Sequence, residues 1–220
     1  MESSAELRRL LYRIYGDTSR QLSLPLSGSI LEIPCYFPSI SSLKANLLPI
    51  DYLRFLVKVR ARNILISAYD VVHSKPETTR RIIALLRKAR KQGSRVMIDC
   101  GNYESFWKKD LTWTSRRYYR IIKLLPHHLA TIFDDHDQIN GNTRNIKLIE
   151  KETKRLEELQ LQSVVVPIIH ASQARIIRVA KAVANRLRPL LVAMPERELG
   201  NGIIERVTTL VQIRRELNRL

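Results

Sequence analysis

Residues 96–105 have the sequence Val96-Met97-Ile98-Asp99-Cys100-Gly101-Asn102-Tyr103-Glu104-Ser105. A short apolar run ends here in a carboxylate, and a glycine follows two residues later. Such a run is typical of a strand that is buried on both faces of a parallel sheet. Parallel α/β folds keep their chemistry at the carboxyl ends of the strands, so Asp99 marks a candidate site.

Similar apolar runs alternate with helical patterns along the rest of the chain. The expected strands cover residues 30–34, 64–70, 95–99, 130–134, 164–170 and 190–194, and the expected helices cover residues 50–58, 77–92, 114–125, 142–161, 172–187 and 203–220. This alternation predicts an α/β fold with a parallel sheet that helices cover on both faces. Six units are fewer than the eight of a TIM-type barrel, which takes about 250 residues. The alternatives are an open six-unit sheet and an incomplete TIM-type (β/α) barrel with about six βα units.

The domain boundary is expected near residue 30. Residues 1–29 form an N-terminal extension in this interpretation, which ends in a segment rich in serine, proline and glycine (residues 23–29). No linker or shift in composition interrupts residues 30–220, so they are expected to form one domain.

The composition is that of a globular protein with a large excess of positive charge. Of the 220 residues, 45% are hydrophobic, and no apolar run approaches the roughly 20 residues of a membrane span. The N-terminus lacks the pattern of a secretory signal, and the two cysteines are far apart, so a cytoplasmic protein without a membrane partner is expected. Lys and Arg outnumber Asp and Glu by 38 to 21, and the net charge of +17 predicts a nucleic-acid partner.

Polar groups follow most of the expected strands. They are Asp70, Asp99, Asp134, His170, and the pair Glu196 and Glu198 after the last strand. In a parallel sheet these ends point the same way, so the side chains should meet at one edge. Helix capping is the alternative explanation for any single acid, but it does not account for a histidine.

Two kinds of chemistry suit these groups. A carboxylate can accept the N–H groups of a purine-like base and serve as a general base, and Tyr103 or Tyr69 could stack on a flat ring. A metal site built from His136, Asp137, Asp134 and His170 is the alternative, because clusters of Asp and His bind zinc or manganese.

The strand ends together resemble a known family, the tRNA-guanine transglycosylases, which exchange bases in tRNA to make queuosine and archaeosine. Residues 98–104 resemble the family's D-S-G-G-F-Q loop, and residues 132–135 look like its F-D-E-C stretch. Residues 167–172 are similar to its G-I-V-Q-G-G segment, and residues 193–200 to its A-V-G-E strand end. The four matches keep the family's order between about residues 30 and 220.

The resemblance implies a TIM-type barrel that replaces a base in tRNA, or in DNA as in divergent relatives, by guanine or a 7-deazaguanine-type base. If the roles of the matching family residues apply here, Asp99 would accept a proton and contact the base, and Asp134 would bind the edge of the ring. His170 stands where the family has a glutamine that contacts the base. The other implied substrate-binding residues are Gly101, Asn102, Tyr103 and Glu196.

Asn102, Tyr103 and Glu104 depart from the family's glycine, phenylalanine and glutamine. The family's nucleophilic aspartate and cysteine-rich zinc site lie beyond the sixth unit, so no residue here takes either role and no cofactor is predicted. A partner chain or a second copy would complete the barrel. Two other functions stay open: a non-catalytic nucleic-acid-binding subunit with the same barrel, and a metal-dependent hydrolase on a TIM-type barrel.

Overall fold

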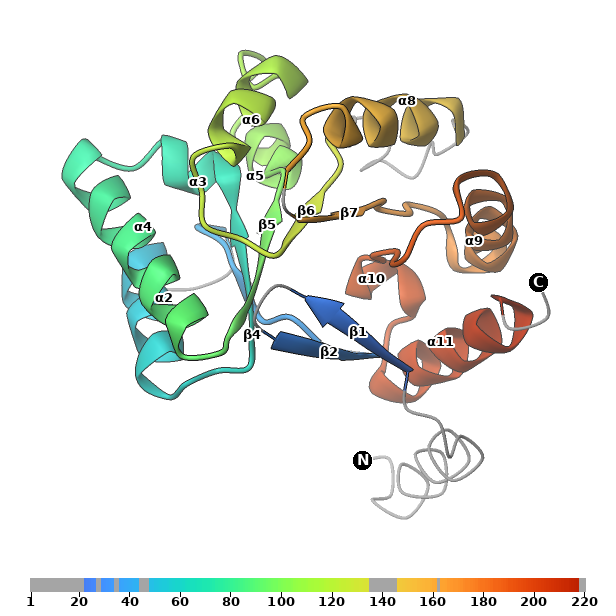
Figure 1. Cartoon of the computed structure of the whole chain (residues 1–220). Helices are drawn as coiled ribbons and strands as arrows, with labels where there is room; N and C mark the ends of the chain where they lie inside the picture. Colours follow the sequence, from blue (N-terminus) through green and yellow to red (C-terminus); the bar gives the residue numbers. More distant parts are fainter. Residues whose placement is uncertain are drawn as a thin grey trace.

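The computed structural model describes residues 22–26, 29–33, 36–43, 48–134, 146–161 and 163–217. Figure 1 shows the chain. The strands are β1 (Leu22–Leu26), β2 (Ser29–Ile33), β3 (Ser39–Ile40), β4 (Asn63–Ser67), β5 (Arg95–Asp99), β6 (Leu129–Thr131) and β7 (Val164–Val166). The helices are α2 (Pro49–Lys58), α3 (Ala68–Val72), α4 (Pro76–Lys91), α5 (Asn102–Trp107), α6 (Ser115–Ile122), α8 (Ile146–Glu157), α9 (Gln173–Leu187), α10 (Glu196–Leu199) and α11 (Ile203–Leu217).

Five strands form one parallel sheet in the order β3-β4-β5-β6-β7. Each strand pairs with its predecessor in the chain, so that Ile98 lies opposite Ile66 on one side and Ala130 on the other. Beyond β7, Ile168 forms a parallel bridge with Ala193. The expected α/β fold with a parallel sheet is therefore confirmed, and within the described residues no pairing of β3 with β7 closes a barrel.

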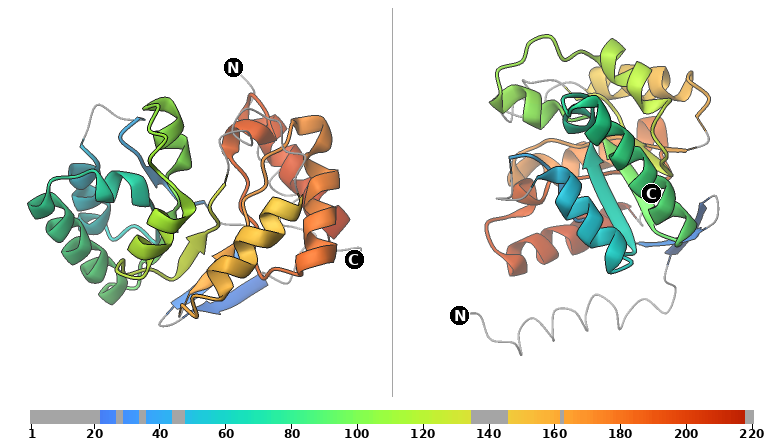
Figure 2. Two further views of the ribbon diagram at one scale, coloured as in Figure 1. Left: turned by 90° about the horizontal axis from the view of Figure 1, so that it is seen from above. Right: turned by 90° about the vertical axis from the view of Figure 1, so that its left-hand side faces the viewer.

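The helices lie around the sheet in chain order (Figure 1). Figure 2 shows α2 and α4 grouped at one end of the sheet and α8, α9 and α11 at the other. In α4 the buried side chains are Ile82, Leu86 and Ala89, whose spacing places them on one face of the helix. Gly93 follows this helix with a φ of 84°, as expected of a glycine that stops a helix. The main core is formed by these faces and by strand residues such as Ile66.

The first expected strand belongs to another sheet. Residues 30–34 were expected to open the parallel sheet, but β2 pairs antiparallel with β1, and β3 is the first strand of the parallel sheet. The hairpin spans the boundary expected near residue 30. Leucines alternate with smaller residues in β1, which is a strand pattern, and Pro25 fits a strand that has a neighbour on only one side.

Four other expected strands are shorter than the sequence suggests. Strand β4 stops at Ser67, so Asp70 lies in α3 rather than at the end of the strand. Strands β6 and β7 have three residues each, and the last expected strand, residues 190–194, is reduced to the bridge at Ala193. Single backbone hydrogen bonds continue beyond these points, from Ile132 to Val166 at 3.1 Å and from Ile169 to Ala193 at 2.9 Å.

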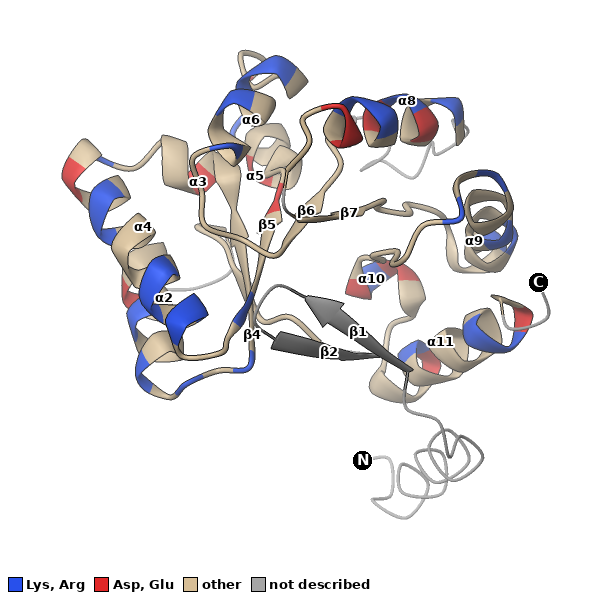
Figure 3. Cartoon of the chain, in the orientation of Figure 1, with Lys and Arg blue, Asp and Glu red and all other residues tan. Residues whose placement is uncertain are grey.

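Charged side chains lie mainly on the helices, where Figure 3 shows Lys and Arg spread over α2, α4, α6, α8, α9 and α11. Acidic residues also occur at the end of β5 and in the short helices α3, α5 and α10 (Figure 3). Within the part of the chain that the structure describes, no helix combines the length and the apolar character needed to cross a membrane.

Candidate functional site

The carboxyl ends of β5, β6 and β7 bring acidic side chains and one histidine together. Asp99 is the last residue of β5, Asp134 follows β6, and His170 follows β7. The parallel direction of these strands places their ends at the same edge of the sheet. With Glu104 from α5 and Glu198 from α10, these residues form a group that we call the carboxylate–histidine cluster.

A chain of hydrogen bonds runs through the cluster. His170 Nε2 lies 2.8 Å from Asp134 Oδ2, and His170 Nδ1 lies 2.8 Å from Glu198 Oε1. The other oxygen of Glu198 accepts the backbone N–H of Ala171 at 2.7 Å. Cys100 Sγ donates to Asp134 Oδ1 at 2.6 Å. Both oxygens of Asp134 and both oxygens of Glu198 are therefore engaged within the protein.

His170 is held as a cation. Its side chain is buried, which alone would lower its pKa, but hydrogen bonds and charges from Asp134 and Glu198 outweigh that effect and raise the pKa to about 9. At neutral pH the imidazolium thus lies between two carboxylates, and the guanidinium of Arg197, 3.8 Å from Glu198 Oε1, supplies a second positive charge.

Asp99 has the opposite character, because its ionised form is disfavoured. Burial raises the pKa of this carboxyl to about 7, with further repulsion from Glu104 and Asp134. The N–H of Gly101 donates to Asp99 at 3.0 Å, and this bond and the charge of His170 oppose the rise. Both protonation states of Asp99 are therefore populated near neutral pH, which is the property of a general acid and base.

Two aromatic side chains hold the strand ends in place. Trp113 Nε1 donates to the carbonyl of Cys100 at 3.0 Å, and the Tyr118 hydroxyl donates to the carbonyl of Thr131 at 2.6 Å. Thr131 Oγ1 accepts the backbone N–H of Cys100 at 2.9 Å and so ties β6 to the end of β5. These bonds satisfy backbone groups where the ladder ends and fix the separation of the two strands.

The loop after Asp99 is built for close packing. Gly101 has a φ of 77°, and a Cβ atom there would lie less than 3 Å from Tyr69 Cβ and Ser67 Oγ. The buried Asn102 donates its side-chain N–H to the carbonyl of Asp134 and accepts the hydroxyl of Ser105 at 3.1 Å. Gly101 and Asn102, both predicted to bind substrate, thus hold the loop against α3 and Asp134.

Tyr103 and Glu196 lie outside the hydrogen-bonded chain. The guanidinium of Arg197 lies 5.1 Å from the ring centre of Tyr103, over the face that was expected to stack on a substrate. Glu196 has a side chain that is 55% exposed and pairs with Arg206. Its neighbour Glu198, two residues along, is the acid that reaches His170. Tyr69 is buried and stacks on His73 with 3.9 Å between ring centres.

A second group of polar residues adjoins the cluster at the end of β4. The Ser67 hydroxyl donates to Glu104 at 3.1 Å, and burial raises the pKa of Glu104. Asp70 accepts the backbone N–H and the hydroxyl of Ser42 at 2.7 and 2.6 Å, and Lys108 Nζ lies 3.5 Å away. Asp70, which was expected at a strand end, is thus a structural link between residue 42 and α3.

The predicted metal site is only partly described. Asp134 and His170 are in contact, but His136 and Asp137 lie outside the described residues. Among the described residues, no three His, Cys, Asp or Glu side chains are arranged to hold a metal ion.

Sequence reasoning did not assign two members of the cluster. Glu104 occupies the first turn of α5, a helix that was not expected, and Glu198 belongs to the four-residue α10. A sequence signal existed for Glu198, because it follows the last apolar run together with Glu196, but the sequence does not tell which of the two faces inward.

No protein-family model matches this sequence, and no curated protein matches it at a significant level.

Proposed function

We propose that this chain is a base-exchange domain of the transglycosylase type, which inserts guanine or a 7-deazaguanine-type base into tRNA or DNA. The observation that carries this proposal is the meeting of Asp99, Asp134 and His170 at the carboxyl edge of a parallel sheet, where burial and neighbouring acids raise the pKa of Asp99. Raised carboxyl pKa values beside a paired charge are typical of sites that move protons.

Base exchange requires a group that both gives and takes a proton. The bond between the sugar and the outgoing base breaks, and that base takes up a proton as it leaves. The incoming base then forms the new bond and gives up its own proton. A carboxyl group with a pKa near 7 performs both transfers at neutral pH, and we assign this role to Asp99. No residue of this chain is assigned as the nucleophile toward the sugar.

Asp134 and His170 have a positioning role in this proposal. Both oxygens of Asp134 and both nitrogens of His170 already have hydrogen-bond partners. A ring edge could bind to them only by displacing one of those partners. Asp99 is held more loosely, because one oxygen accepts the N–H of Gly101 at 3.0 Å and the other lies 3.4 Å from the Thr131 hydroxyl. We therefore assign substrate contact to Asp99, at the cost of the longer of these bonds, and assign Asp134 and His170 to the support of the loop, which departs from the roles that the family resemblance implies.

The proposal includes a larger architecture. Sequential parallel strands with a helical segment between them are the arrangement of a TIM-type barrel, and the strands β3 to β7 follow this order. The proposal places the closing units of the barrel and the nucleophile outside the residues that the structure describes.

An exchange assay with labelled guanine tests the proposal. The protein, together with any chain that copurifies with it, is incubated with unmodified tRNA and with duplex DNA. We expect incorporation into one of them, and we expect Asp99→Asn to lower the rate by about 100-fold or more. Asp51→Asn, at an exposed aspartate of α2, should leave it unchanged. Absence of incorporation under conditions in which the nucleic acid is bound would overturn the proposal.

A non-catalytic nucleic-acid-binding subunit is the second candidate. It is favoured by the internal pairing of Asp134, His170 and Glu198, because a site whose polar atoms are all engaged needs no substrate. In that case tRNA or DNA binds without exchange, and Asp99→Asn leaves binding unchanged.

A further inference from the structure

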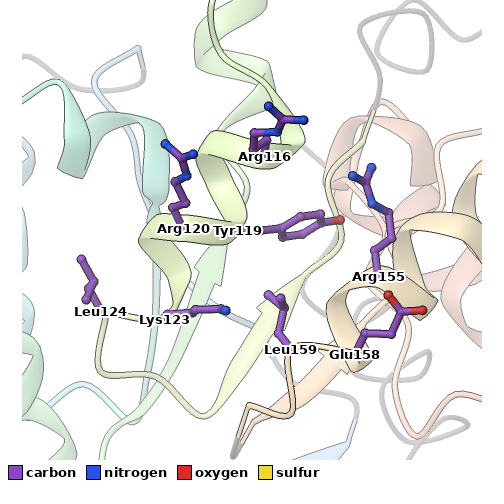
Figure 4. Close-up of a pocket in the computed structure, with 8 residues that line it drawn as sticks. All are labelled: Arg116, Tyr119, Arg120, Lys123, Leu124, Arg155, Glu158 and Leu159. Carbon is purple, nitrogen blue, oxygen red and sulfur yellow. The ribbon is translucent and has the colours of Figure 1, made fainter.

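A groove of about 560 Å³ lies between α6 and α8, on elements that lead into and out of β6 (Figure 4). Arg116 and Arg120 of α6 line it together with Lys123, the C-cap of that helix. Arg155 of α8 lines the other wall together with Glu158, which follows the last residue of that helix. Four cations thus face one carboxylate. The groove is separate from the carboxylate–histidine cluster, because none of that cluster's residues lines it.

The three cations from α6 form a row. Residues 116, 120 and 123 are one and two turns apart on a single face of the helix and span about 10 Å along its axis. Figure 4 shows the three side chains coming from the same helical segment, with Lys123 pointing toward Leu159 and Arg120 pointing away from α8. Within the described part of the chain, none of the three has a hydrogen bond or an ion pair. Their charge is therefore available to a ligand.

Arg155 on the opposite wall is paired within the protein. Arg155 binds Glu152 at 3.1 Å, and the Tyr119 hydroxyl donates to the same carboxylate at 2.5 Å. The guanidinium of Arg155 lies 5.7 Å from the ring centre of Tyr119. This ring is buried and covered, so it offers no surface on which a base could stack.

We propose that this groove binds the phosphate backbone of a nucleic acid. Three unpaired cations spread over about 10 Å of one helix face can each neutralise a phosphate of a polyanionic backbone. Because the groove has no free aromatic face on which a base could stack, we expect it to contact phosphates and not bases. Such contacts position the nucleic acid but do not depend on its sequence. A flat lipid surface fits the concave wall poorly. The choice of partner rests on the proposed function, because base exchange requires a bound tRNA or DNA.

Salt-dependent binding tests this inference with matched variants. One triple variant carries Arg116→Gln, Arg120→Gln and Lys123→Gln, and the control carries Arg80→Gln, Arg87→Gln and Lys91→Gln on α4. Each removes two arginines and one lysine from exposed positions of one helix, and each lysine lies at the C-terminal end of its helix. The probes are a labelled tRNA transcript, a labelled DNA duplex and vesicles that contain phosphatidylserine. Thermal melting verifies that both variants are folded.

We expect the groove variant to bind tRNA or DNA at least about ten-fold more weakly, with a salt slope that is lower by about 2 to 3. The α4 control should lose clearly less. An equal loss in both variants would mean that only net charge matters, and this would overturn the inference. A loss confined to the vesicles would also overturn it. Because this test measures binding alone, a groove effect without base exchange would refute the proposed function and leave the groove assignment intact.

Discussion

Asp99 and His170 are both buried at the same edge of the sheet, but the protein favours the neutral form of one and the charged form of the other. Burial and neighbouring acids push the Asp99 carboxyl toward its neutral form, whereas two carboxylates keep His170 charged. Asp99 can therefore exchange a proton near neutral pH, whereas His170 keeps its positive charge there. This contrast leads to different responses to pH.

Asp99→Asn should stabilise the protein at alkaline pH. The pKa of Asp99 is about 7 in the folded chain against an ordinary 3.8, so its contribution favours folding at low pH and is lost as the pH rises through 7. Asparagine carries no charge to desolvate. Urea unfolding at pH 4 and pH 8 should show a gain that is larger at pH 8, and Asp51→Asn should show no such difference. A variant that loses stability at pH 8 would contradict the assigned pKa.

The contribution of His170 should disappear at alkaline pH. Its pKa is about 9 in the folded chain against an ordinary 6.5, so its stabilisation is complete below pH 6.5 and is lost as the pH rises through 9. The shift corresponds to about 3 kcal/mol. His170→Gln should remove this part of the pH dependence and cost about 3–5 kcal/mol at pH 6, because two buried carboxylates lose their partner.

The control for this measurement is His73→Gln, at a partly exposed histidine that stacks on Tyr69. In the His73→Gln variant, the free energy of unfolding should still fall between pH 6.5 and 9, as it does in the unmodified protein. The assignment fails if His170→Gln keeps that decline as well.

Part of the candidate site could be predicted from single residues. Asp99, Asp134 and His170 follow apolar runs, and the parallel sheet brings such positions together without further information. The inward orientation of Glu198 rather than Glu196 could not be predicted, because it depends on how α10 packs near Ala171. The packing role of Asn102 depends in the same way on the carbonyl of Asp134, a residue distant in sequence.

The turn from β5 into α5 depends on one glycine. Gly101→Ala should cost about 2–4 kcal/mol, because a positive φ disfavours alanine and the new Cβ would overlap Tyr69 and Ser67. Gly93→Ala is the matched control, since Gly93 has a similar φ of 84° but no neighbour within 4 Å. It should cost only about 1–2 kcal/mol. Equal losses in urea unfolding would show that the Gly101 contact is unimportant.

The short helix α10 contains two glutamates whose contributions to stability can be compared, one that pairs with His170 and one that is exposed. Glu198→Gln should destabilise the protein by about 2–4 kcal/mol, because it weakens a buried ion pair with His170. Glu196→Gln affects an exposed pair with Arg206 and should change stability by less than about 1 kcal/mol. Chemical denaturation of both variants measures the difference. A larger loss from Glu196→Gln would show that the other acid faces inward.

At the level of elements, the long helices were the most predictable. Helices α2, α4, α9 and α11 begin within one residue of their expected starts, because apolar spacing and boundary residues such as Gly93 act over short distances. Strand lengths were less predictable, since β6 and β7 end where side chains such as Thr131 begin to bond across the sheet. The partner of β2 was predicted wrongly, because an apolar run does not encode whether its neighbour is parallel.

The charge of the whole molecule leads to a prediction about salt. A net charge of +17 opposes compaction by self-repulsion. The thermal midpoint should therefore rise as sodium chloride is added up to about 0.2 M, where the screening length is near 8 Å. Added sulfate should raise it further, because this anion also strengthens apolar burial. A midpoint that falls with sodium chloride would mean that exposed ion pairs outweigh the repulsion.

The sequential order of the sheet also bears on how the chain acquires its shape. Each strand pairs with residues roughly 30 positions earlier, as Ile98 does with Ile66 and Ala130 does with Ile98, so few contacts require distant parts of the chain to meet. A growing polypeptide can thus add one strand at a time to the edge left by the previous one, in the order in which the ribosome releases them. The acid from β5 is then in position before the histidine that follows β7 has been synthesised, and its partners arrive last.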